Sequence, residues 1–352
     1  MNLVVPEGID DPSRPSGGNT YDRQVRRWLR AEGWAVSTRE VAGDWPWPDA
    51  EARRRLQRAL EAVPAGAVAL VDGLVASASP DVLLPAATRR PVVVLVHMPV
   101  ASWTAERDAS SLERAVLRAV ASVVVTSSWT RRWLLEHYGL DPARVHVARP
   151  GVAPVSTNVV TGTPADDGTR LLCVGAVTPG KGQDVLVSAL AELGDRRWLC
   201  ELVGSSTRAP EFVDGVRQQV REAGLEDRVV LAGARTGSDL DASYAAADVL
   251  VLPTRGETYG MVVTEALAHG LPVIASAVGG VPEALGRTPQ GELPGLLVPP
   301  GDAHALAGTI GRWLGDPGLR ARLRDAARAR RGTLTGWPET ADEVGRVLEE
   351  VR

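Results

Sequence analysis

The chain contains a single lysine, Lys181, within the segment PGKGQDVL (179–186). Lysine and arginine together number 39, so every other cationic side chain of this kind is an arginine. A compact ammonium on a flexible stem is not interchangeable with a planar guanidinium. The segment follows a strand-like run that ends at Gly175 and opens a helical pattern. An ammonium beside a helix N-terminus could neutralise a departing diphosphate, and the alternative is a solvated loop lysine.

Two glutamates lie eight residues apart in the segment PTRGETYGMVVTEALAHGLPVIASAVGG (253–280). Glu257 falls in a predicted loop, and Glu265 falls inside the predicted helix MVVTEALAHG. An ionised carboxylate in such apolar surroundings is costly unless a ligand hydrogen-bonds to it. Two carboxylates in different environments suit the recognition of hydroxyl groups. Gly260, between them, lets backbone amides at the helix start point at phosphate oxygens. Two ordinary surface glutamates are the alternative.

Two further candidates lie in the first half of the chain. Gly17 and Gly18 directly precede Asn19 and Thr20, which we expect to cap a helix. A glycine pair lets backbone approach a ligand, and the helix N-terminus can bind an anion, although a tight turn is the alternative. His97 follows a core strand, where it either meets a ligand or is a satisfied core histidine.

Composition excludes several classes of protein. The chain has 352 residues, a formal net charge of −4 and a pI near 5.8, without the basic footprint of a nucleic-acid binder. Its longest apolar run, residues 91–101, is too short to cross a bilayer. We therefore expect a cytoplasmic protein with no membrane span and no nucleic-acid partner. Cys173 and Cys200 lie in strand-like segments and predict buried thiols.

Short apolar runs alternate with amphipathic helical segments along the chain. Continuous apolar strands indicate a sheet covered on both faces, and helical spacers imply right-handed parallel crossovers. The sequence therefore predicts a doubly wound α/β architecture with ligands beyond the carboxyl ends of the strands. The predicted strands are LVVP (3–6), AVALVDG (67–73), VVVLVHM (92–98), SVVVTSS (122–128), RLLCVGAV (170–177), WLCELVG (198–204), RVVLAG (228–233), DVLVLPT (248–254) and PVIAS (272–276).

A change of composition divides the chain almost in half. Residues 149–170 are rich in Pro, Gly, Thr and Asp and have no periodic core face. This segment predicts a linker between two Rossmann-like domains, residues 1–150 and residues 151–336, with a cleft between them.

These motifs together resemble the bacterial retaining glycosyltransferases of family four, which have the two-domain GT-B fold. In the second half the resemblance rests on PGKGQDVL, LDASYAAADVLVLPT, the Glu-x7-Glu stretch ETYGMVVTE and ALAHGLPVIASAVGGVPE. In the first half it rests on SGGN, His97, VVTSSWT and HVARPGV, and it covers nearly the whole chain. It implies that the last helix, about 337–352, packs back on the first domain.

The resemblance also implies roles for individual residues. Lys181 would contact the diphosphate of a nucleotide-sugar donor, Glu257 the hydroxyls of the transferred sugar, and Glu265 the ribose hydroxyls. His97 would lie near the donor sugar or the acceptor, and with Lys181 and Glu257 it completes the predicted catalytic set. The donor-binding set implied is Gly17, Gly18, Gly175, Lys181, Glu257, Thr258, Tyr259, Gly260, Met261, Val262 and Glu265.

The sequence departs from the family pattern at two places. Ala176 stands where family members usually have an arginine after the strand-ending glycine. Either Arg149 or Arg255 substitutes for this phosphate cation, or donor affinity is weaker. Thr258 and Tyr259 replace the common Gly-Phe pair and could reshape the sugar pocket.

The expected reaction moves a hexose-type sugar, with UDP favoured as nucleotide, to a hydroxyl of a small soluble acceptor. The resemblance implies front-face attack with charge stabilisation of the diphosphate by Lys181 and the helix start. No cofactor and no metal are expected, because the Asp-x-Asp pair Asp239 and Asp241 opens a helix pattern and predicts a cap. Peripheral membrane contact is not expected, and we expect the chain to be a monomer or a homodimer.

Three alternatives remain open at this point. A nucleotide-sugar epimerase would convert the donor without an acceptor. A phosphorylase would use its lysine for pyridoxal phosphate, although a Gly-Lys-Gly helix start suits phosphate better. A non-catalytic nucleotide-sugar-binding protein would bind the donor without turnover.

Overall fold

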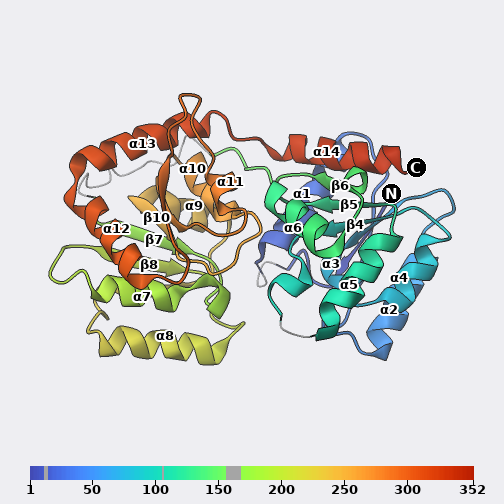
Figure 1. Ribbon diagram of the computed structural model, residues 1–352, viewed down its shortest axis with the longest axis horizontal. Coiled ribbons are helices and arrows are strands. Elements are labelled where there is room, and N and C mark those ends of the chain that lie inside the picture. The colour runs from blue at the N-terminus through green and yellow to red at the C-terminus, as the bar shows by residue number, and fades with distance from the viewer. Residues whose placement is uncertain (12–14, 105–106, 156–167) are drawn as a thin grey trace. The chain divides into compact units, whose positions relative to one another are not determined.

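The computed structural model describes residues 1–11, 15–104, 107–155 and 168–352. The chain divides into two compact units (Figure 1). Unit 1 comprises Met1–Gly151 and Thr335–Arg352, and unit 2 comprises Val152–Leu334. Most of the predicted linker, residues 156–167, lies outside the described residues.

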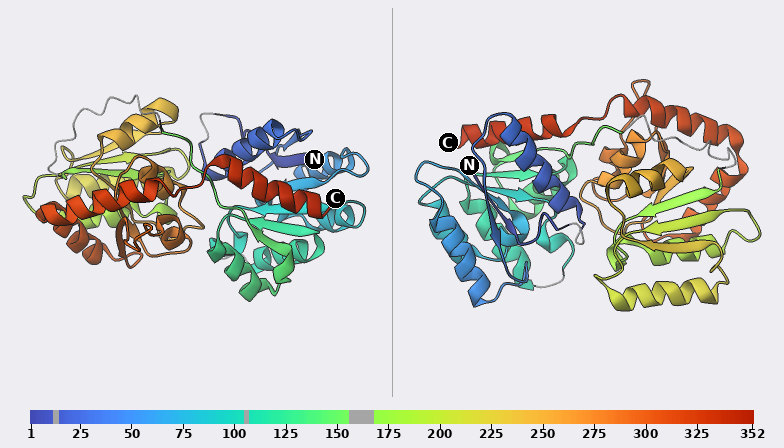
Figure 2. Two further views of the ribbon diagram at one scale, coloured as in Figure 1. Left: turned by 90° about the horizontal axis from the view of Figure 1, so that it is seen from above. Right: turned by 180° about the vertical axis from the view of Figure 1, so that it is seen from behind.

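Unit 1 contains a six-stranded parallel sheet in the order β2-β1-β3-β4-β5-β6. All five residues of its central strand β4 are buried, because helices cover both faces of the sheet (Figure 2). The strands are β1 Asn2–Pro6, β2 Ser37–Val41, β3 Ala69–Asp72, β4 Val92–Val96, β5 Ser122–Val125 and β6 Val145–Val147. The helices are α1 Gly17–Ala31, α2 Ala50–Glu61, α3 Gly73–Ala76, α4 Pro80–Ala87, α5 Arg107–Ala119, α6 Ser128–Tyr138 and α14 Trp337–Glu350, with 3-10 turns η1 Val100–Ser102 and η2 Pro142–Arg144.

Unit 2 contains a second six-stranded parallel sheet, in the order β12-β11-β10-β7-β8-β9. Separate apolar clusters fill its two faces, one under α7, α8 and α12 and one under α10 and α11. The strands are β7 Arg170–Val174, β8 Leu199–Val203, β9 Val229–Gly233, β10 Val249–Leu252, β11 Val273–Ser276 and β12 Gly295–Val298. The helices are α7 Gln183–Ala191, α8 Pro210–Glu222, α9 Gly237–Ala246, α10 Met261–Ala268, α11 Val281–Leu285, α12 Ala303–Gly315 and α13 Pro317–Arg331, with the 3-10 turn η3 Pro179–Lys181.

The predicted doubly wound α/β architecture is confirmed in both units. Three strands were missed, namely β2, β6 and β12, and each lies at the edge of its sheet. Edge strands have one unpaired side and need no continuous apolar run, as the sequence STREV of β2 illustrates.

The strand order reverses direction at one place in each sheet. In unit 2 the chain leaves β7 toward β8 on one side, and β10 returns to the other side of β7. In unit 1 the corresponding place lies between β1 and β3. Ligands of open α/β sheets bind beyond the carboxyl ends of the strands at such switch points. The segments after β7 and β10, and after β1 and β3, are therefore the places to look for a site.

The C-terminal helix α14 belongs to unit 1, where it lies beside α1 (Figure 1). Trp337 packs edge-on against Tyr21 of α1, with ring centroids 5.7 Å apart. The hydroxyl of Thr340 donates to the carbonyl of Arg149 at 2.7 Å. A Cβ at Gly151 would lie 2.3 Å from the carbonyl carbon of Gly336, so the chain approaches too closely there for a side chain.

Two predicted helix caps are wrong. The first helix begins at Gly17, and its cap is Ser16, whose hydroxyl accepts from the amide of Asn19 at 3.0 Å. Helix α9 is capped by Thr236, which places Asp239 in its first turn. The Ser16 hydroxyl supplies the capping hydrogen bond of α1. Thr236 makes no capping side-chain hydrogen bond at α9, and in both helices the cap residue precedes a glycine that enters the helix. Within the described part of the chain, no helix combines the length and apolarity needed to cross a membrane.

Candidate active site

Lys181 ends the 3-10 turn η3 immediately before α7, rather than lying in the helix itself. Gly182 follows with φ +69°, and a Cβ there would lie 2.3 Å from the carbonyl oxygen of Pro253. The hydroxyl of Thr254 and the amide of Arg255 both donate to the carbonyl of Gly180, at 2.9 and 2.8 Å. The loop after β7 is therefore bound to the chain that leaves β10, and glycine is required where they meet.

This packing brings Lys181 and Glu257 together at the switch point of unit 2. The Nζ of Lys181 donates to Oε2 of Glu257 at 2.6 Å. Their side chains are 30% and 11% exposed, so the ion pair is accessible from solvent without being fully solvated. A charge-assisted hydrogen bond of this length fixes both groups before any ligand arrives. A Cβ at Gly175 would contact the Lys181 stem at 3.6 Å.

The loop that carries Glu257 is fixed by two glycines after β11. The amide of Gly280 donates to the carbonyl of Glu257 at 2.9 Å. A Cβ at Gly279 would lie 1.7 Å from that carbonyl oxygen, and one at Gly280 would lie 2.1 Å from the carbonyl oxygen of Thr258. Any other residue at either position would push the loop away and displace the carboxylate.

The loop then enters α10 through Gly260, which has φ +98° and caps the helix without a side-chain hydrogen bond. The first-turn residues Met261 and Val262 are partly exposed. Backbone amides at such an uncapped start attract an anion. The side chain of Tyr259 belongs to the buried core beneath α10, so its backbone rather than its ring is the candidate ligand contact.

Glu265 lies one turn further along α10 and is partly exposed. The hydroxyl of Tyr244, in α9, donates to its Oε2 at 2.8 Å. Burial raises the pKa of Glu265, and the hydrogen bond from Tyr244 opposes that shift. Tyr244 carries no signal in the sequence beyond its position in a helical pattern, and sequence reasoning missed it.

Both arginines proposed as substitutes for the missing phosphate cation are bound to other side chains of their own unit. The guanidinium of Arg255 binds both carboxylate oxygens of Asp184, at 2.8 and 2.7 Å. Arg149 belongs to unit 1, where it donates to the hydroxyl of Ser128 at 2.9 Å. The carbonyl of Ala176 accepts from the side-chain amide of Gln183 at 3.1 Å.

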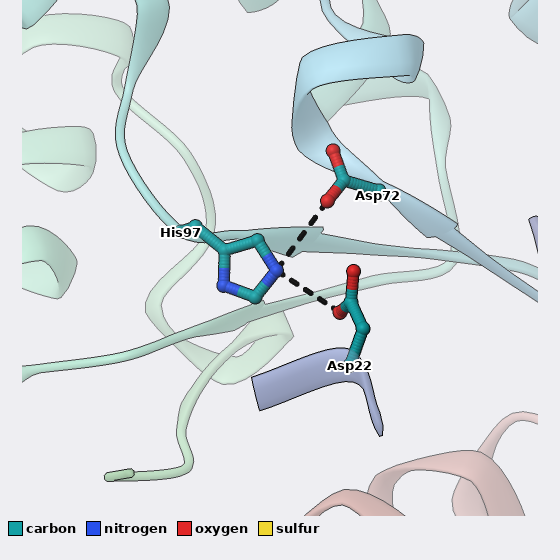
Figure 3. A group of neighbouring side chains, drawn as sticks. All are labelled: Asp22, Asp72 and His97. Atoms are coloured by element: carbon teal, nitrogen blue, oxygen red, sulfur yellow. Dashed lines mark hydrogen bonds and ion pairs between the residues drawn. The ribbon is translucent and has the colours of Figure 1, made fainter. Parts of the chain in front are cut away.

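The switch point of unit 1 gathers a histidine and two carboxylates (Figure 3). The Nε2 of His97 lies 3.0 Å from Oδ1 of Asp22 and 3.4 Å from Oδ2 of Asp72. Asp72 ends β3 and Asp22 lies in α1, one helical turn after Gly18. A Cβ at Gly18 would approach the His97 ring to 3.2 Å, so this turn of α1 packs directly on the imidazole. Sequence reasoning found Gly17, Gly18 and His97 but missed both aspartates, although Asp72 closes an apolar run.

The surroundings of His97 make it a cation. Burial alone would lower its pKa, but Asp22 and Asp72 outweigh burial and raise the pKa of His97 to about 10. Burial also raises the pKa of Asp22 to about 6, against the pull of His97. Asp22 is 1% exposed and its Oδ2 has no hydrogen-bond partner among the described residues. Figure 3 shows the other ring nitrogen of His97 pointing away from both carboxylates.

The same three side chains could also be considered as metal ligands, since their ligand atoms lie within 4.8 Å of one another. A divalent ion needs a neutral imidazole nitrogen. A pKa of about 10 on His97 means that the ion would have to displace a tightly held proton at neutral pH. Without an ion, the arrangement holds an imidazolium between two carboxylates.

Comparisons with known proteins cover both halves of the chain. Residues 15–155 match the family described as Glycosyltransferase Family 4, and residues 158–330 match the family described as Glycosyl transferases group 1. D-inositol 3-phosphate glycosyltransferase of Kineococcus radiotolerans is 36% identical over 65% of this chain and 57% of its own length. The Corynebacterium glutamicum protein of the same name is 30% identical over 74% of this chain and 67% of its own length.

The matched region spans little more than half the length of the first of these curated relatives. Among solved structures, sucrose-phosphate synthase of Thermosynechococcus elongatus is 26% identical, with a TM-score of 0.78 over 99% of this chain and 98% of that chain. The similarity therefore extends over both sheets and over the residues that form the two clusters described above.

Proposed function

The chain belongs to glycosyltransferase family 4, and from that premise we propose that it moves a hexose-type sugar from a nucleotide diphosphate sugar to a hydroxyl of a small soluble acceptor. The anomeric configuration is retained, and UDP is the favoured nucleotide because it is common among the proteins that this chain resembles. The observation that carries the proposal is the 2.6 Å pair of Lys181 and Glu257 at the switch point of unit 2.

In this proposal the two members of the pair bind neighbouring parts of the donor. An ammonium has three N–H donors, and one of them is directed at Glu257. The other two are available to oxygens of the diphosphate, while the remaining lone pairs of Glu257 accept from sugar hydroxyls. The amides at the start of α10 add a second positive pole for the phosphate.

The chemical step is a substitution at the anomeric carbon on the face that the leaving group occupies. The bond from the anomeric carbon to the phosphate oxygen breaks, and a bond to the acceptor oxygen forms on the same face. The departing phosphate oxygen takes the proton of the acceptor hydroxyl. Lys181 and the α10 start stabilise the charge that develops on the diphosphate, which is the larger part of catalysis in such a reaction.

His97 supplies a second charged group in this proposal. Because its Nε2 is held by Asp22 and Asp72, its Nδ1–H is the donor left for a sugar or acceptor oxygen. Gly17 and Gly18 let the start of α1 approach the phosphate groups. The curated relatives are named for D-inositol 3-phosphate, and that name supports a small soluble acceptor here without identifying it.

The test is product formation with UDP-glucose and a panel of free polyols and polyol phosphates, followed by proton NMR of the product. We expect a new glycoside whose anomeric coupling matches that of the donor. An inverted coupling would reject the retaining mechanism. Conversion of UDP-glucose to another nucleotide sugar without acceptor would indicate an epimerase, and tight binding without any turnover would indicate a sensor.

A further inference from the structure

A buried tyrosine holds the carboxylate of Glu265. Tyr244 is 2% exposed and lies in α9, whereas Glu265 lies in α10 and is partly exposed. The Tyr244 hydroxyl donates to Oε2 of Glu265 at 2.8 Å. Burial raises the pKa of Tyr244 well above its ordinary value, so this hydroxyl keeps its proton and donates at any physiological pH.

The tyrosine is itself fixed by the residue that follows α10. The ring of His269 stacks on the ring of Tyr244, with centroids 4.9 Å apart and an angle of 23°. Nδ1 of His269 lies 2.9 Å from the carbonyl of Glu265, which assigns the donated proton to Nδ1. Its Nε2 faces Asp241 of α9 at 3.4 Å. Tyr244 and His269 thus hold the side chain and the backbone of the same glutamate.

The carboxylate is held at one oxygen only. Throughout the described residues, Oε1 of Glu265 has no hydrogen bond to protein, and the residue is partly exposed. A carboxylate fixed in this way cannot rotate freely to find new donors, so its remaining lone pairs have a defined direction.

We propose that Tyr244 is a positioning residue that makes the site selective for ribonucleotides over 2′-deoxyribonucleotides. It directs the free lone pairs of Glu265 toward the two ribose hydroxyls of the donor. This inference rests on the proposed function, in which Glu265 meets the ribose. A nucleotide whose ribose lacks the 2′-hydroxyl leaves the partly buried carboxylate of Glu265 without one hydrogen-bond donor. Because the carboxylate is fixed, it cannot rotate to find another donor. The chain therefore discriminates against thymidine diphosphate sugars.

The experiment is calorimetric titration of the full chain with a ribonucleoside diphosphate and its 2′-deoxy counterpart. The probe is whichever of UDP, GDP and ADP binds the wild type most tightly. We expect the wild type to prefer the ribonucleotide by on the order of tenfold, the effect of one lost hydrogen bond to a charged group. Tyr244→Phe should reduce this affinity ratio to about twofold or less, mainly by weakening the binding of the ribonucleotide.

A matched control exists in unit 1. The hydroxyl of Tyr138 donates to the buried carboxylate of Glu113 at 2.6 Å, so Tyr138→Phe also removes a buried tyrosine–glutamate hydrogen bond. It should lower stability and leave the ribose ratio unchanged. If Tyr244→Phe does not fold, His269→Gln, which removes the stacked ring, should lower the ratio part of the way.

The outcomes separate this inference from the proposed function. If Glu265→Gln removes the ribose preference while folded Tyr244→Phe keeps it, Tyr244 has no positioning role and the function stands. If Tyr244→Phe does not fold and His269→Gln keeps the wild-type ratio of ribonucleotide to deoxyribonucleotide affinity, the inference is rejected in the same way. If none of the three nucleotides binds the wild type, or Glu265→Gln changes neither affinity, the assignment of Glu265 to the ribose fails together with this inference.

Discussion

The two sheets carry charged clusters at equivalent places, but the clusters are built differently. In unit 2 one ammonium faces one carboxylate, and both side chains are partly exposed. In unit 1 one imidazolium faces two carboxylates, and Asp22 and Asp72 are almost completely buried. The unit 2 pair balances its own charge, whereas the unit 1 cluster has one carboxylate in excess when all three groups are ionised.

This difference means that the charged groups of unit 2 can exchange each other for a ligand, whereas those of unit 1 are held together by the fold. An accessible ion pair loses little free energy when a diphosphate binds its ammonium and sugar hydroxyls bind its carboxylate. Buried carboxylates that lose the cation they face are left unpaired at a large cost in free energy. We therefore expect substitutions at Lys181 to affect activity far more than stability, and substitutions at His97 to affect both.

Replacing Lys181 should have the largest effect on catalysis. In the proposed reaction Lys181 stabilises the leaving diphosphate, so Lys181→Gln should lower kcat/KM by on the order of 10²–10³-fold. Its effect on the free energy of unfolding should stay below about 1 kcal/mol, as for an accessible ion pair. Steady-state kinetics and denaturant titration measure the two quantities. If Lys181→Gln keeps its activity but has a lower free energy of unfolding, the expectation that Lys181 matters more for activity than for stability is wrong.

Replacing Lys181 by arginine refines this test. A planar guanidinium keeps the charge but cannot place three donors around one nitrogen. Lys181→Arg should therefore recover only part of the lost activity, and full recovery would show that charge alone is required.

Replacing His97 should destabilise the chain. His97→Gln leaves Asp22 and Asp72 without their cation and should lower the free energy of unfolding by about 3 kcal/mol at neutral pH. Lys181→Gln is the matched comparison, since it also exchanges a cation for an amide. Equal destabilisation by the two substitutions would contradict the difference drawn between the clusters.

The unit 1 cluster should also make stability depend on pH. Because folding raises the pKa of His97 from 6.5 to about 10, its contribution is complete below pH 6.5 and is lost as pH rises through 10. Asp22 acts in a separate acidic window, since its pKa rises from 3.8 to about 6 and its contribution is lost as pH rises through that range. The free energy of unfolding should fall between pH 6.5 and 10 in the wild type and fall less in His97→Gln. Parallel curves would show that His97 is not held as a cation.

The smallest effect should follow the loss of Arg255. Its guanidinium is bound to Asp184, so Arg255→Gln should change the affinity for UDP by less than about threefold, as for an exposed ion pair. Calorimetric titration measures this change. A drop of tenfold or more would mean that Arg255 leaves Asp184 on donor binding and replaces the arginine missing at position 176.

The sequence predicted the inner strands of both sheets and the neighbourhood of Lys181, Gly260 and Glu265 because these depend on local patterns. Buried parallel strands are continuous apolar runs, and a glycine-rich segment after such a run indicates a ligand loop. The edge strands β2 and β6 were missed because half-paired strands tolerate polar residues, as in STREV and VHV. The edge strand β12, GLLV, is apolar but only four residues long and was missed between proline-rich flanks.

Partners that come from distant segments could not be predicted in the same way. Asp22 lies in α1, Asp72 ends β3 and His97 follows β4, and only the strand order places them together. Tyr244 and Glu265 likewise lie on separate helices. Residue spacing within one segment does not indicate these contacts, so only the structure could identify them.

The most direct measurement is calorimetric titration of the full chain with UDP, GDP, ADP and TDP and their glucose, N-acetylglucosamine and mannose conjugates. It is run on the wild type, Lys181→Ala and Glu265→Ala. We expect one ribonucleotide to bind the wild type and both substitutions to weaken it by at least about tenfold, since each removes a charged hydrogen-bond partner. If nothing binds, or if binding ignores both substitutions, the switch point of unit 2 is not a donor site and the proposed sugar transfer loses its chemical basis.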